Sequence, residues 1–377
     1  MLNPDDMRRY SRQLLLPDFG TSGQEKLRAA AVLVIGAGGL GSPVLQYLAA
    51  AGVGRLGVVD HDVVDASNLQ RQVLFTTPEI GESKAIVAAR RLRLMNPLVD
   101  VHEFPIRLTS HNALELFAQF DVVVDGSDNL PTRYLVNDAC VLTGKPLIYG
   151  AVFQFEGQVS VFNQLLSDGS RGPNYRDLFP DPPPPEMVPS CSEGGVMGAL
   201  TGVIGSMQAN EAIKVISGVG ESLSGRLMIF DAAAFVPRIL KVRKRDDNPL
   251  MGTAPTQTTL IDYETFCHLM PSGNEEISTA EVKRWIDQGI PFQWIDVRES
   301  YEFEAGHLAT QHIPLSELPT HVDQLLRTMP VIVHCKSGSR GAQACKYLRK
   351  AGFTNVRNMQ GGMLRWQQEI DPQLIVY

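Results

Sequence analysis

AVLVIGAGGLGSPVLQYLAAAGVGRLGVVD, residues 31–60, is the stretch from which the fold can be worked out. It contains an apolar β-branched run, a turn with four glycines, a stretch with apolar residues at helical spacing and a second apolar run, at residues 31–35, 36–41, 43–51 and 56–59. Strand, glycine turn, helix and strand, closed by Asp60, form the pattern of a nucleotide-binding βαβ unit. Glycines let the backbone approach a phosphate, and a helix N-terminus attracts an anion. The stretch itself does not distinguish one nucleotide from another.

The composition is that of a soluble globular protein. Of 377 residues, 44% are hydrophobic and 20% charged, and the net charge of −7 disfavours general binding to nucleic acids or anionic membranes. The lack of an apolar run of about 18 residues predicts no transmembrane helix, and the acidic N-terminus is unlike a signal peptide. The five cysteines never occur as C-x-x-C, which indicates a reducing, cytoplasmic compartment.

Alternating strand and helix patterns predict an α/β protein with two domains. Residues 1–245 are expected to form a sheet that is parallel at first and mixed later, and 273–377 a second, small α/β domain, with a polar linker at 246–272. Four consecutive prolines lie within residues 167–194. We interpret that segment as a crossover loop carrying Cys191, because strand and helix patterns resume after it.

Polar side chains follow the predicted strands of the first domain. They are Asp60, Asp62, Asn68, Arg71, Gln72, Asp128 and Asn129, with Lys84 at the start of a predicted helix. A nucleoside triphosphate needs cations for its phosphates and a carboxylate for Mg²⁺, whereas a dinucleotide has no use for this set. The set therefore favours ATP, attacked at its α-phosphorus. An NAD-dependent oxidoreductase remains the alternative, because a single acid or arginine in a loop is more often a cap or a surface ion pair.

Four motifs occur in order within residues 1–245: GAGGLGSP, DHDVVDASNLQRQ, GESKA and DGSDNLPTRYLVNDAC. Together they resemble the ubiquitin-activating superfamily, in particular the molybdopterin-synthase and thiamin-pathway adenylyltransferases (MoeB and ThiF types). The resemblance implies a Rossmann-like mixed sheet that binds ATP. The residues that it implies for nucleotide binding are Gly36, Gly38, Gly39, Gly41, Asp60, Asp62, Ser67, Asn68, Leu69, Gln70, Arg71, Gln72, Lys84, Asp128 and Asn129.

Individual roles are also implied by the resemblance. Asp60 would hold the ribose. Asn68, Arg71 and Lys84 would bind the triphosphate, and Asp128, with Asn129 beside it, would bind Mg²⁺. Arg12 of the N-terminal arm would reach the triphosphate of a neighbouring subunit, which implies a homodimer. From spacing alone, the same arm would be a solvated helix face.

The reaction that the resemblance implies is adenylation of the C-terminal glycine of a ubiquitin-like sulfur carrier that ends in Gly-Gly. The molybdopterin synthase small subunit is the expected carrier, and the carriers of thiamin synthesis and of tRNA thiolation are alternatives. Cys191 matches a cysteine that becomes covalently linked to the carrier in some members, and a plain loop cysteine is the alternative interpretation.

One departure from the resemblance concerns a structural zinc site. Relatives carry two C-x-x-C pairs where this chain has NYRD at 174–177 and NPLM at 248–251. Structural Zn²⁺ is held by four ligands, typically thiolates and imidazoles. We therefore expect no structural zinc in this protein.

The C-terminal domain has a cysteine directly after a predicted buried strand, in VIVHCKSGSR at 331–340. The following helix, the backbone N–H groups of the loop and nearby cations predict a thiolate or persulfide at Cys335. With IDVRE, EAGH and GGM at 295–299, 304–307 and 361–363, this loop resembles a rhodanese. The resemblance implies that Cys335 takes sulfur from thiosulfate or a cysteine desulfurase and that the carrier leaves as a thiocarboxylate. A non-enzymatic scaffold that docks ubiquitin-like proteins is the remaining alternative.

Overall fold

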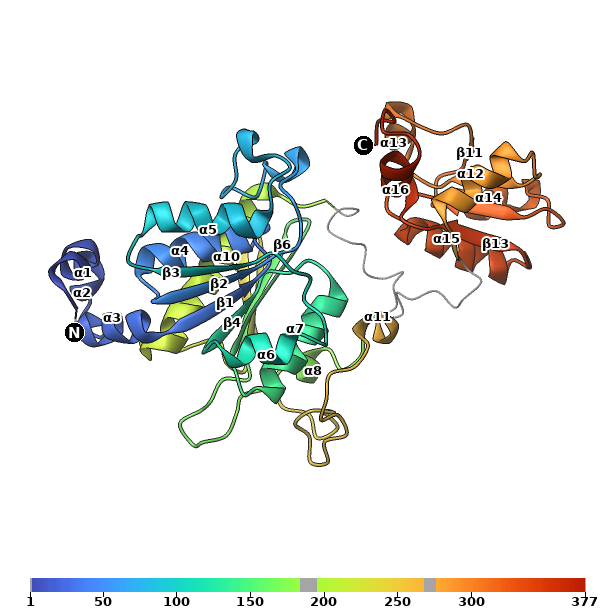
Figure 1. Cartoon of the computed structure of the whole chain (residues 1–377). Helices are drawn as coiled ribbons and strands as arrows, with labels where there is room; N and C mark the ends of the chain where they lie inside the picture. The colour runs from blue at the N-terminus through green and yellow to red at the C-terminus, as the bar shows by residue number, and fades with distance from the viewer. Residues whose placement is uncertain (1, 184–194, 268–275, 377) are drawn as a thin grey trace. The chain divides into compact units, whose positions relative to one another are not determined.

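The computed structural model describes residues 2–183, 195–267 and 276–376. The chain divides into two compact units, Met1–Cys267 and His268–Tyr377 (Figure 1). The first unit is built on an eight-stranded sheet in the order β3-β2-β1-β4-β5-β6-β7-β8. Its strands are β1 (Ala31–Ile35), β2 (Arg55–Val59), β3 (Asp100–Phe104), β4 (Val122–Asp125), β5 (Leu147–Phe153), β6 (Glu156–Phe162), β7 (Arg226–Asp231) and β8 (Val236–Lys241).

The parallel half of this sheet contains the βαβ unit predicted from the sequence. β1 is buried along its whole length and pairs in parallel with β2 on one side and β4 on the other. Between β1 and β2 lies α4 (Gly41–Ala51), which starts at Gly41 rather than at Pro43 as predicted and ends at Gly52 with a left-handed φ of 84°. Because parallel strands end at one edge of a sheet, the polar residues that follow β1, β2 and β4 come together there.

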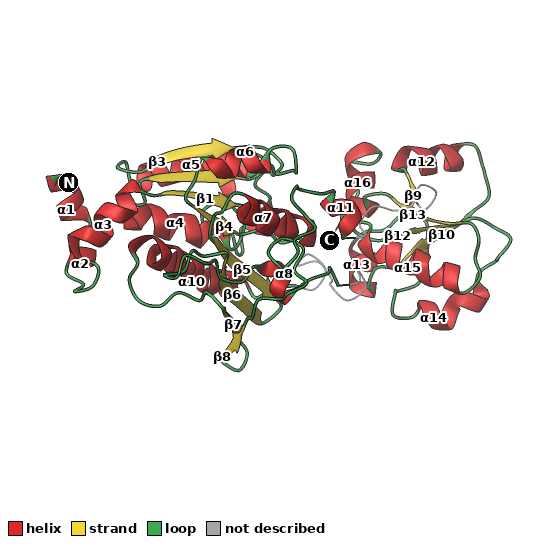
Figure 2. Ribbon diagram, turned by 90° about the horizontal axis from the view of Figure 1, so that it is seen from below, coloured by secondary structure: helices red, strands yellow, loops and turns green. Residues whose placement is uncertain are grey.

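Helices cover both faces of the sheet (Figures 1 and 2). On one face, α4, α5 and α10 share a core that includes Leu48, Leu92 and Ala212, and on the other, α6 and α7 contribute Phe117 and Tyr134. The α/β class with a Rossmann-like mixed sheet is thereby confirmed. The helices are α1 (Pro4–Arg9), α2 (Ser11–Leu14), α3 (Gly20–Ala29), α5 (Lys84–Met95), α6 (Ala113–Ala118), α7 (Leu130–Leu142), α8 (Tyr175–Leu178), α10 (Gly198–Ser217) and α11 (Tyr263–Phe266).

The antiparallel half differs from the sequence expectation at one turn. Alternation in the sequence predicts a single strand over 152–163, but β5 continues to Phe153 and the chain reverses at Gln154, whose φ is 51°. The tight hairpin pairs Phe153 with Glu156, so that β6 can lie between β5 and β7. At the outer edge, β8 is exposed at every position.

The segment after β8 packs onto a buried ion pair of the first unit. Asp138 of α7 and Arg176 of α8 are almost fully buried, and Arg176 donates from Nε and Nη2 to the carboxylate at 3.0 and 2.6 Å. Gln257 Nε2 and the Tyr263 hydroxyl each donate to the same carboxylate at 2.8 Å. We call these four residues the Asp138 cluster. Part of the segment predicted as a linker, 246–272, thus belongs to the first unit.

At three of the four positions where the sequence resemblance implies zinc-binding cysteines, the polar residues Asn174, Asp177 and Asn248 form hydrogen bonds with one another. The carboxylate of Asp177 accepts the N–H of Asn174 at 2.8 Å, the N–H of Arg245 at 2.9 Å and Nδ2 of Asn248 at 2.7 Å. Asn174 and Asn248 are buried. These bonds join the same two chain segments that a zinc ion would join.

The second unit is a parallel sheet in the order β11-β10-β12-β13-β9 with helices packed against it. Its central strand β12 is buried throughout, which confirms the small α/β domain. Among the helices of residues 2–183, 195–267 and 276–376, none has the length and hydropathy needed to cross a membrane. The elements of the unit are β9 (Glu276–Ile277), α12 (Thr279–Asp287), β10 (Gln293–Asp296), α13 (Ser300–Ala305), β11 (Gln311–His312), α14 (Leu318–His321), β12 (Val331–His334), α15 (Ser339–Lys350), β13 (Val356–Met359) and α16 (Gly362–Glu369).

Candidate active sites

The glycine loop, residues 36–41, has a geometry that only glycine allows at two positions. Gly36 has a φ of +88°, and a Cβ at Gly41 would lie 1.9 Å from the carbonyl oxygen of Gly36. Asp60, at the end of β2, accepts the N–H of Ala37 at 2.8 Å and the N–H of Asp62 at 2.9 Å. Burial raises the pKa of Asp60 above its ordinary value, and these two bonds and the charge of Lys84 offset only part of that rise. Asp60 therefore holds the loop in shape.

A buried cation lies beside the glycine loop. Lys84 is the first residue of α5 and is 6% exposed, and its Nζ contacts Oδ2 of the exposed Asp62 at 3.1 Å. A desolvated ammonium group whose carboxylate partner is exposed to solvent can bind a phosphate oxygen in place of that carboxylate. Among the described residues, Asp60, His61 and Asp62 also bring three possible metal-ligand atoms within 4.8 Å of one another.

Residues 66–72 form a second wall of this site. Arg71 donates to the carbonyl oxygen of Ser67 at 3.2 Å, which folds its side chain along its own loop. Gln72 is buried, and within the described chain its Oε1 has no hydrogen-bond partner. A Cβ at Gly38 would lie 3.7 Å from Nε2 of Gln72, so this amide faces the glycine loop. A buried acceptor without a partner beside a phosphate-type loop fits a site that takes a polar ligand.

Asp128 and Asn129 follow β4 at the same edge of the sheet. Asn129 caps α7 by accepting the N–H of Thr132 at 3.0 Å, and its Nδ2 lies 3.5 Å from Oδ1 of Asp128. The side chain of Asp128 is exposed. The structure thus brings Asp128 to the strand edge where Asp60 ends β2, as the sequence predicts.

One predicted residue of the first unit, Arg12, belongs to a different part of the fold from this group. Arg12 is an exposed residue of α2, in an arm that is tied to its own unit by the bond between Gln13 Nε2 and Gln24 Oε1 at 2.7 Å. Cys191 lies outside the described residues.

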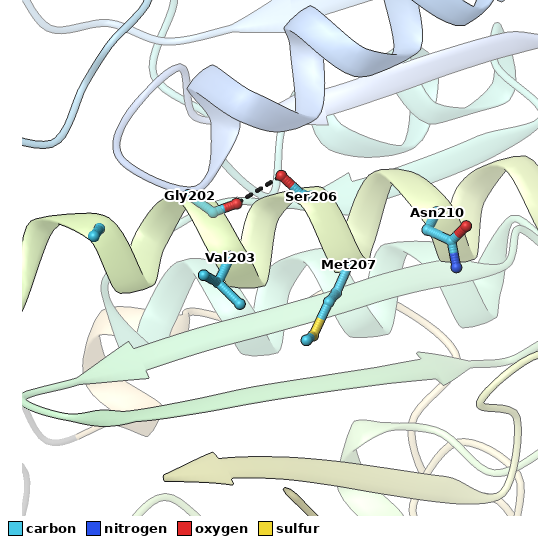
Figure 3. Close-up of a pocket in the computed structure, with 6 residues that line it drawn as sticks. Gly202, Val203, Ser206, Met207 and Asn210 are labelled. Carbon is cyan, nitrogen blue, oxygen red and sulfur yellow. Dashed lines mark hydrogen bonds between the residues drawn. The ribbon is translucent and has the colours of Figure 1, made fainter. Parts of the chain in front are cut away.

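Helix α10 closes the glycine loop on one face and leaves a pocket on the other. Thr201 and Gly205 face the loop, because a Cβ at Gly39 would lie 3.1 Å from Thr201 and a Cβ at Gly205 would lie 2.5 Å from the carbonyl oxygen of Leu40. Figure 3 shows the opposite face, where Val203, Met207 and Asn210 project from the helix. That pocket is lined by Ala199, Gly202, Val203, Ser206, Met207 and Asn210.

In the second unit, the segment that we call the Cys335 loop, residues 335–340, runs from the end of β12 into the first turn of α15. The N–H of Gly338 donates to the Cys335 sulfur at 3.1 Å, and Gly338 has a φ of +107°. Burial raises the pKa of the Cys335 thiol, and backbone N–H groups and Arg340 lower it only in part. The sulfur is fully buried, and burial disfavours the charged form of a thiol, so the thiolate or persulfide expected at Cys335 stays a prediction.

The N-terminus of α16 holds this loop from behind. Met363 and Leu364 donate their N–H groups to the carbonyl oxygens of Cys335 and Lys336 at 2.9 and 3.0 Å. A Cβ at Gly362 would lie 2.3 Å from the Cys335 oxygen, so only glycine permits this approach. In the sequence, GGM at 361–363 is recognisable only as part of a motif. Nothing in that motif shows that these residues hold the backbone of the Cys335 loop.

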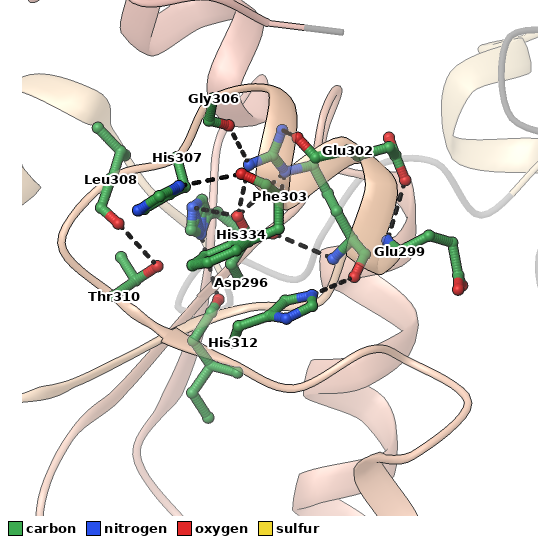
Figure 4. A network of polar contacts seen from close by, with 12 residues as sticks. Asp296, Glu299, Glu302, Phe303, Gly306, His307, Leu308, Thr310, His312 and His334 are labelled. Atoms are coloured by element: carbon green, nitrogen blue, oxygen red, sulfur yellow. Dashed lines mark hydrogen bonds and ion pairs between the residues drawn. The ribbon is translucent and has the colours of Figure 1, made fainter.

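Figure 4 shows a network of polar contacts that includes Asp296, Glu302 and His334, the last of which directly precedes Cys335 in the chain. Arg298 is wholly buried and contacts both oxygens of Asp296. His334, next to Cys335 in the chain, has its pKa lowered to about 4, because burial outweighs the attraction of Asp296. Glu302 of α13 binds Arg340 through both carboxylate oxygens, at 2.6 and 2.8 Å. The sequence contained no local sign of this pair, because its partners are 38 positions apart.

The two sites define two classes of chemistry on one chain. The first is a nucleotide site at the strand edge of a Rossmann-like sheet, and the second is a thiol in a loop lined by N–H groups. The family models agree: ThiF matches residues 10–251, and the rhodanese-like domain matches 278–369. The chain belongs to the ThiF family and carries a rhodanese-like domain at its C-terminal end.

Curated relatives share both parts. The chain is 44% identical to the probable adenylyltransferase/sulfurtransferase MoeZ of Mycobacterium tuberculosis, over 100% of this chain and 96% of that protein. It is 44% identical to the adenylyltransferase and sulfurtransferase MOCS3 of Mus musculus, over 98% and 87%. Over 70% of its length it is 57% identical to the sulfur carrier protein adenylyltransferase of Thermus thermophilus, of which it covers 98%. The chain is therefore an enzyme, an adenylyltransferase and sulfurtransferase.

The solved structures support the fold of the first unit. The crystal structure of E. coli MccB with ATP matches with a TM-score of 0.56 and 23% sequence identity, over 65% of this chain and 73% of that one. At this identity the likeness shows the fold alone. The family assignment favours the triphosphate interpretation of the site over the dinucleotide alternative.

Proposed function

We propose that this enzyme adenylates the C-terminal glycine of a ubiquitin-like sulfur carrier and then converts that glycine to a thiocarboxylate. The main support is that one chain holds both a glycine loop with a buried cation beside it and a cysteine loop lined by N–H groups. One relative of the first unit is itself named a sulfur carrier protein adenylyltransferase. Among carriers with a Gly-Gly tail, the molybdopterin synthase small subunit is the first candidate, followed by those of thiamin synthesis and tRNA thiolation.

In the proposed first step, a carboxylate oxygen of the carrier's terminal glycine attacks the α-phosphorus of ATP, and pyrophosphate leaves. The glycine loop, Asp60 and residues 67–72 would hold the nucleotide. Lys84 and Arg71 would offset the charge of the leaving pyrophosphate, a contribution of about 10²–10³ in rate for one well-placed group. Asp128 is our candidate for holding Mg²⁺, which would supply further charge compensation. No protein nucleophile is needed, so the chain acts by positioning and electrostatics.

In the proposed second step, Cys335 carries a persulfide formed from thiosulfate or a cysteine desulfurase. Its terminal sulfur attacks the acyl carbon of the carrier adenylate, AMP leaves, and an acyl disulfide links the carrier to Cys335. A thiol then attacks the Cys335 sulfur and releases the thiocarboxylate. Cys191 is our candidate for that thiol, and an external dithiol would reduce the disulfide that remains.

Two further features belong to this proposal. The enzyme would be a homodimer in which Arg12 reaches the triphosphate of the other copy, and the exposure of Arg12 supports this. It would hold no structural zinc, and the bonds around Asp177 support this because they occupy the positions of the missing ligands. Metal analysis after removal of loosely bound ions tests the second point, and one zinc per subunit would contradict it.

The decisive experiment offers purified candidate carriers to the enzyme with ATP, Mg²⁺ and a sulfur donor. Mass spectrometry should show the carrier adenylate and then a carrier in which one terminal oxygen is replaced by sulfur. A Cys335→Ser variant should retain carrier-dependent pyrophosphate exchange and lose the sulfur product. Absence of any carrier modification, or exchange that needs no carrier, would contradict the proposed function.

A further inference from the structure

We propose that Glu302 is a positioning residue for sulfur transfer at Cys335: it binds both terminal nitrogens of Arg340, and so fixes this guanidinium beside the Cys335 loop with its charge compensated. The inference rests on the proposed role of Cys335 as the sulfur-carrying residue. It concerns a side chain in a different element, α13, that does not itself belong to the loop.

The contact between the two residues has the geometry of a strong ion pair. Nη1 and Nη2 of Arg340 contact Oε2 and Oε1 of Glu302 at 2.6 and 2.8 Å, and the two side chains are only 15% and 5% exposed. Two parallel bonds between a planar guanidinium and a carboxylate restrict orientation as well as distance. Although burial raises the pKa of Glu302, the bonds from Arg340 and from the N–H of Glu299 lower it overall. Glu302 is therefore ionised at neutral pH.

Glu302 is itself held in place from the other side. Its carboxylate accepts the N–H of Glu299 at 3.0 Å within the first turn of α13. Its carbonyl oxygen accepts Nη1 of Arg298 at 3.2 Å, and Arg298 is bound to Asp296 and to the carbonyl oxygen of Gly306. Figure 4 shows Glu302, Asp296 and Gly306 within one network. Arg340 is thus positioned by a carboxylate that has little freedom to move.

Charged side chains beside the loop occur in oppositely charged pairs. The elements around it carry Asp296, Arg298, Glu302, His334, Lys336 and Arg340, and also other charged residues such as Glu304, Lys346, Arg357 and Arg365. Asp296 pairs with Arg298 and Glu302 with Arg340, while His334 is neutral at pH 7 because its pKa is about 4. From β13, Asn358 presents an uncharged amide to the carbonyl oxygen of Gly338 at 2.9 Å, and Glu276 of β9 bonds Asn358. Lys336 adds a positive charge within the loop itself.

This arrangement predicts opposite effects for the two partners of the pair. Glu302→Gln removes one negative charge beside Arg340, which makes the surroundings of the sulfur more positive and favours the thiolate. In Arg340→Gln, Glu302 becomes an uncompensated anion, which disfavours it. An opposite charge close to an ionisable group shifts its pKa by about one unit or more, so the thiolate fraction at neutral pH changes about tenfold. A residue that only stabilised the fold would not produce effects of opposite sign.

The test measures the rate of Cys335 alkylation by iodoacetamide as a function of pH in the full-length protein, with the Cys335 peptide quantified by mass spectrometry. The midpoint should move to lower pH in Glu302→Gln, with about tenfold faster alkylation at neutral pH, and to higher pH in Arg340→Gln. The double variant should return it toward the wild-type value. Glu302→Asp, which keeps the charge, should stay close to wild type. Glu304→Gln, an exposed carboxylate on the same helix, is the matched control and should change nothing.

An unchanged midpoint in folded Glu302→Gln, or shifts of the same sign in both single variants, would overturn the inference. If Glu302→Gln does not fold, the Arg340→Gln variant alone is used. A shift of its alkylation midpoint to lower pH would then overturn the inference. Persulfide formation on wild-type Cys335 after thiosulfate treatment is measured separately. Its absence would contradict the proposed function of Cys335, whereas the alkylation profile would still report on the pair.

Discussion

Replacing Asp138 by asparagine should destabilise the first unit more than any other single exchange of similar size that we consider. Asp138 is completely buried, and its carboxylate accepts bonds from Arg176, Gln257 and Tyr263. Asparagine keeps the shape but removes the charge, so the guanidinium of Arg176, 2% exposed, is left buried without its counter-ion. Breaking a buried pair in this way costs about 3–5 kcal/mol.

The loss can be expressed as an unfolding temperature. For a domain of this size, 1 kcal/mol corresponds to about 2–4 °C, so Asp138→Asn should lower the transition of the first unit by about 6–20 °C. All three tryptophans, Trp285, Trp294 and Trp366, lie in the second unit. Calorimetry of the full chain measures the transitions of both units. Because the tryptophans report only on the second unit, their fluorescence identifies its transition, and the other transition belongs to the first unit.

Two controls make the measurement decisive. Asp247→Asn removes a carboxylate that pairs with Arg245 on the surface, where both side chains are exposed, and should leave the unfolding temperature unchanged because surface pairs contribute little. A zinc chelator should not shift the wild-type transition if the bonds around Asp177, rather than a metal, join residues 174–177 to residues 245–248. An Asp138→Asn protein that unfolds at the wild-type temperature would refute the reasoning.

Three other outcomes follow from the structure. Gly362→Ala should reduce sulfur transfer strongly without changing carrier-dependent pyrophosphate exchange, because the added Cβ would lie 2.3 Å from the Cys335 oxygen; equal sulfur transfer in both proteins would contradict this. Lys84→Met should lower pyrophosphate exchange by about 10²-fold, measured at saturating carrier, and full activity would remove Lys84 from the proposed site. The second unit should lose about 3 kcal/mol of stability between pH 6.5 and 4, because unfolded histidine takes up a proton near 6.5 whereas His334 does so only near 4. Urea unfolding followed by tryptophan fluorescence measures that loss, and His334→Gln should remove this part of the slope.

The parts of the fold that the sequence predicted are those whose information is local. The apolar run of β1, the glycines that follow it and the acid that ends β2 are contiguous, so their pattern identifies the βαβ unit directly. The same holds for Cys335, whose strand, loop and helix are adjacent in the chain. Polar residues after parallel strands could also be expected together, because the topology of the sheet brings strand ends to one edge.

What the sequence could not predict depends on contacts between distant segments. Asp138 and Tyr263 are separated by 125 positions, and although Asp138 belongs to the motif DGSDNLPTRYLVNDAC, nothing in that motif points to Tyr263. The pKa of Cys335 is a similar case: the loop and Arg340 are visible in the sequence, but the burial that raises this pKa is a property of the whole unit. Local pattern gives the identity of a site, whereas its electrostatics requires the packed structure.

The edge strand β8 has a consequence for self-association. A strand at the end of a sheet presents unpaired backbone groups to which a strand of another molecule can add. β8 is exposed throughout and carries the apolar side chains Val236, Ile239 and Leu240. Pro237 cannot donate a backbone hydrogen bond, and Arg238 adds a positive charge that repels a second copy of the same strand. We infer that these two residues keep the edge from templating aggregates, a protection unrelated to catalysis.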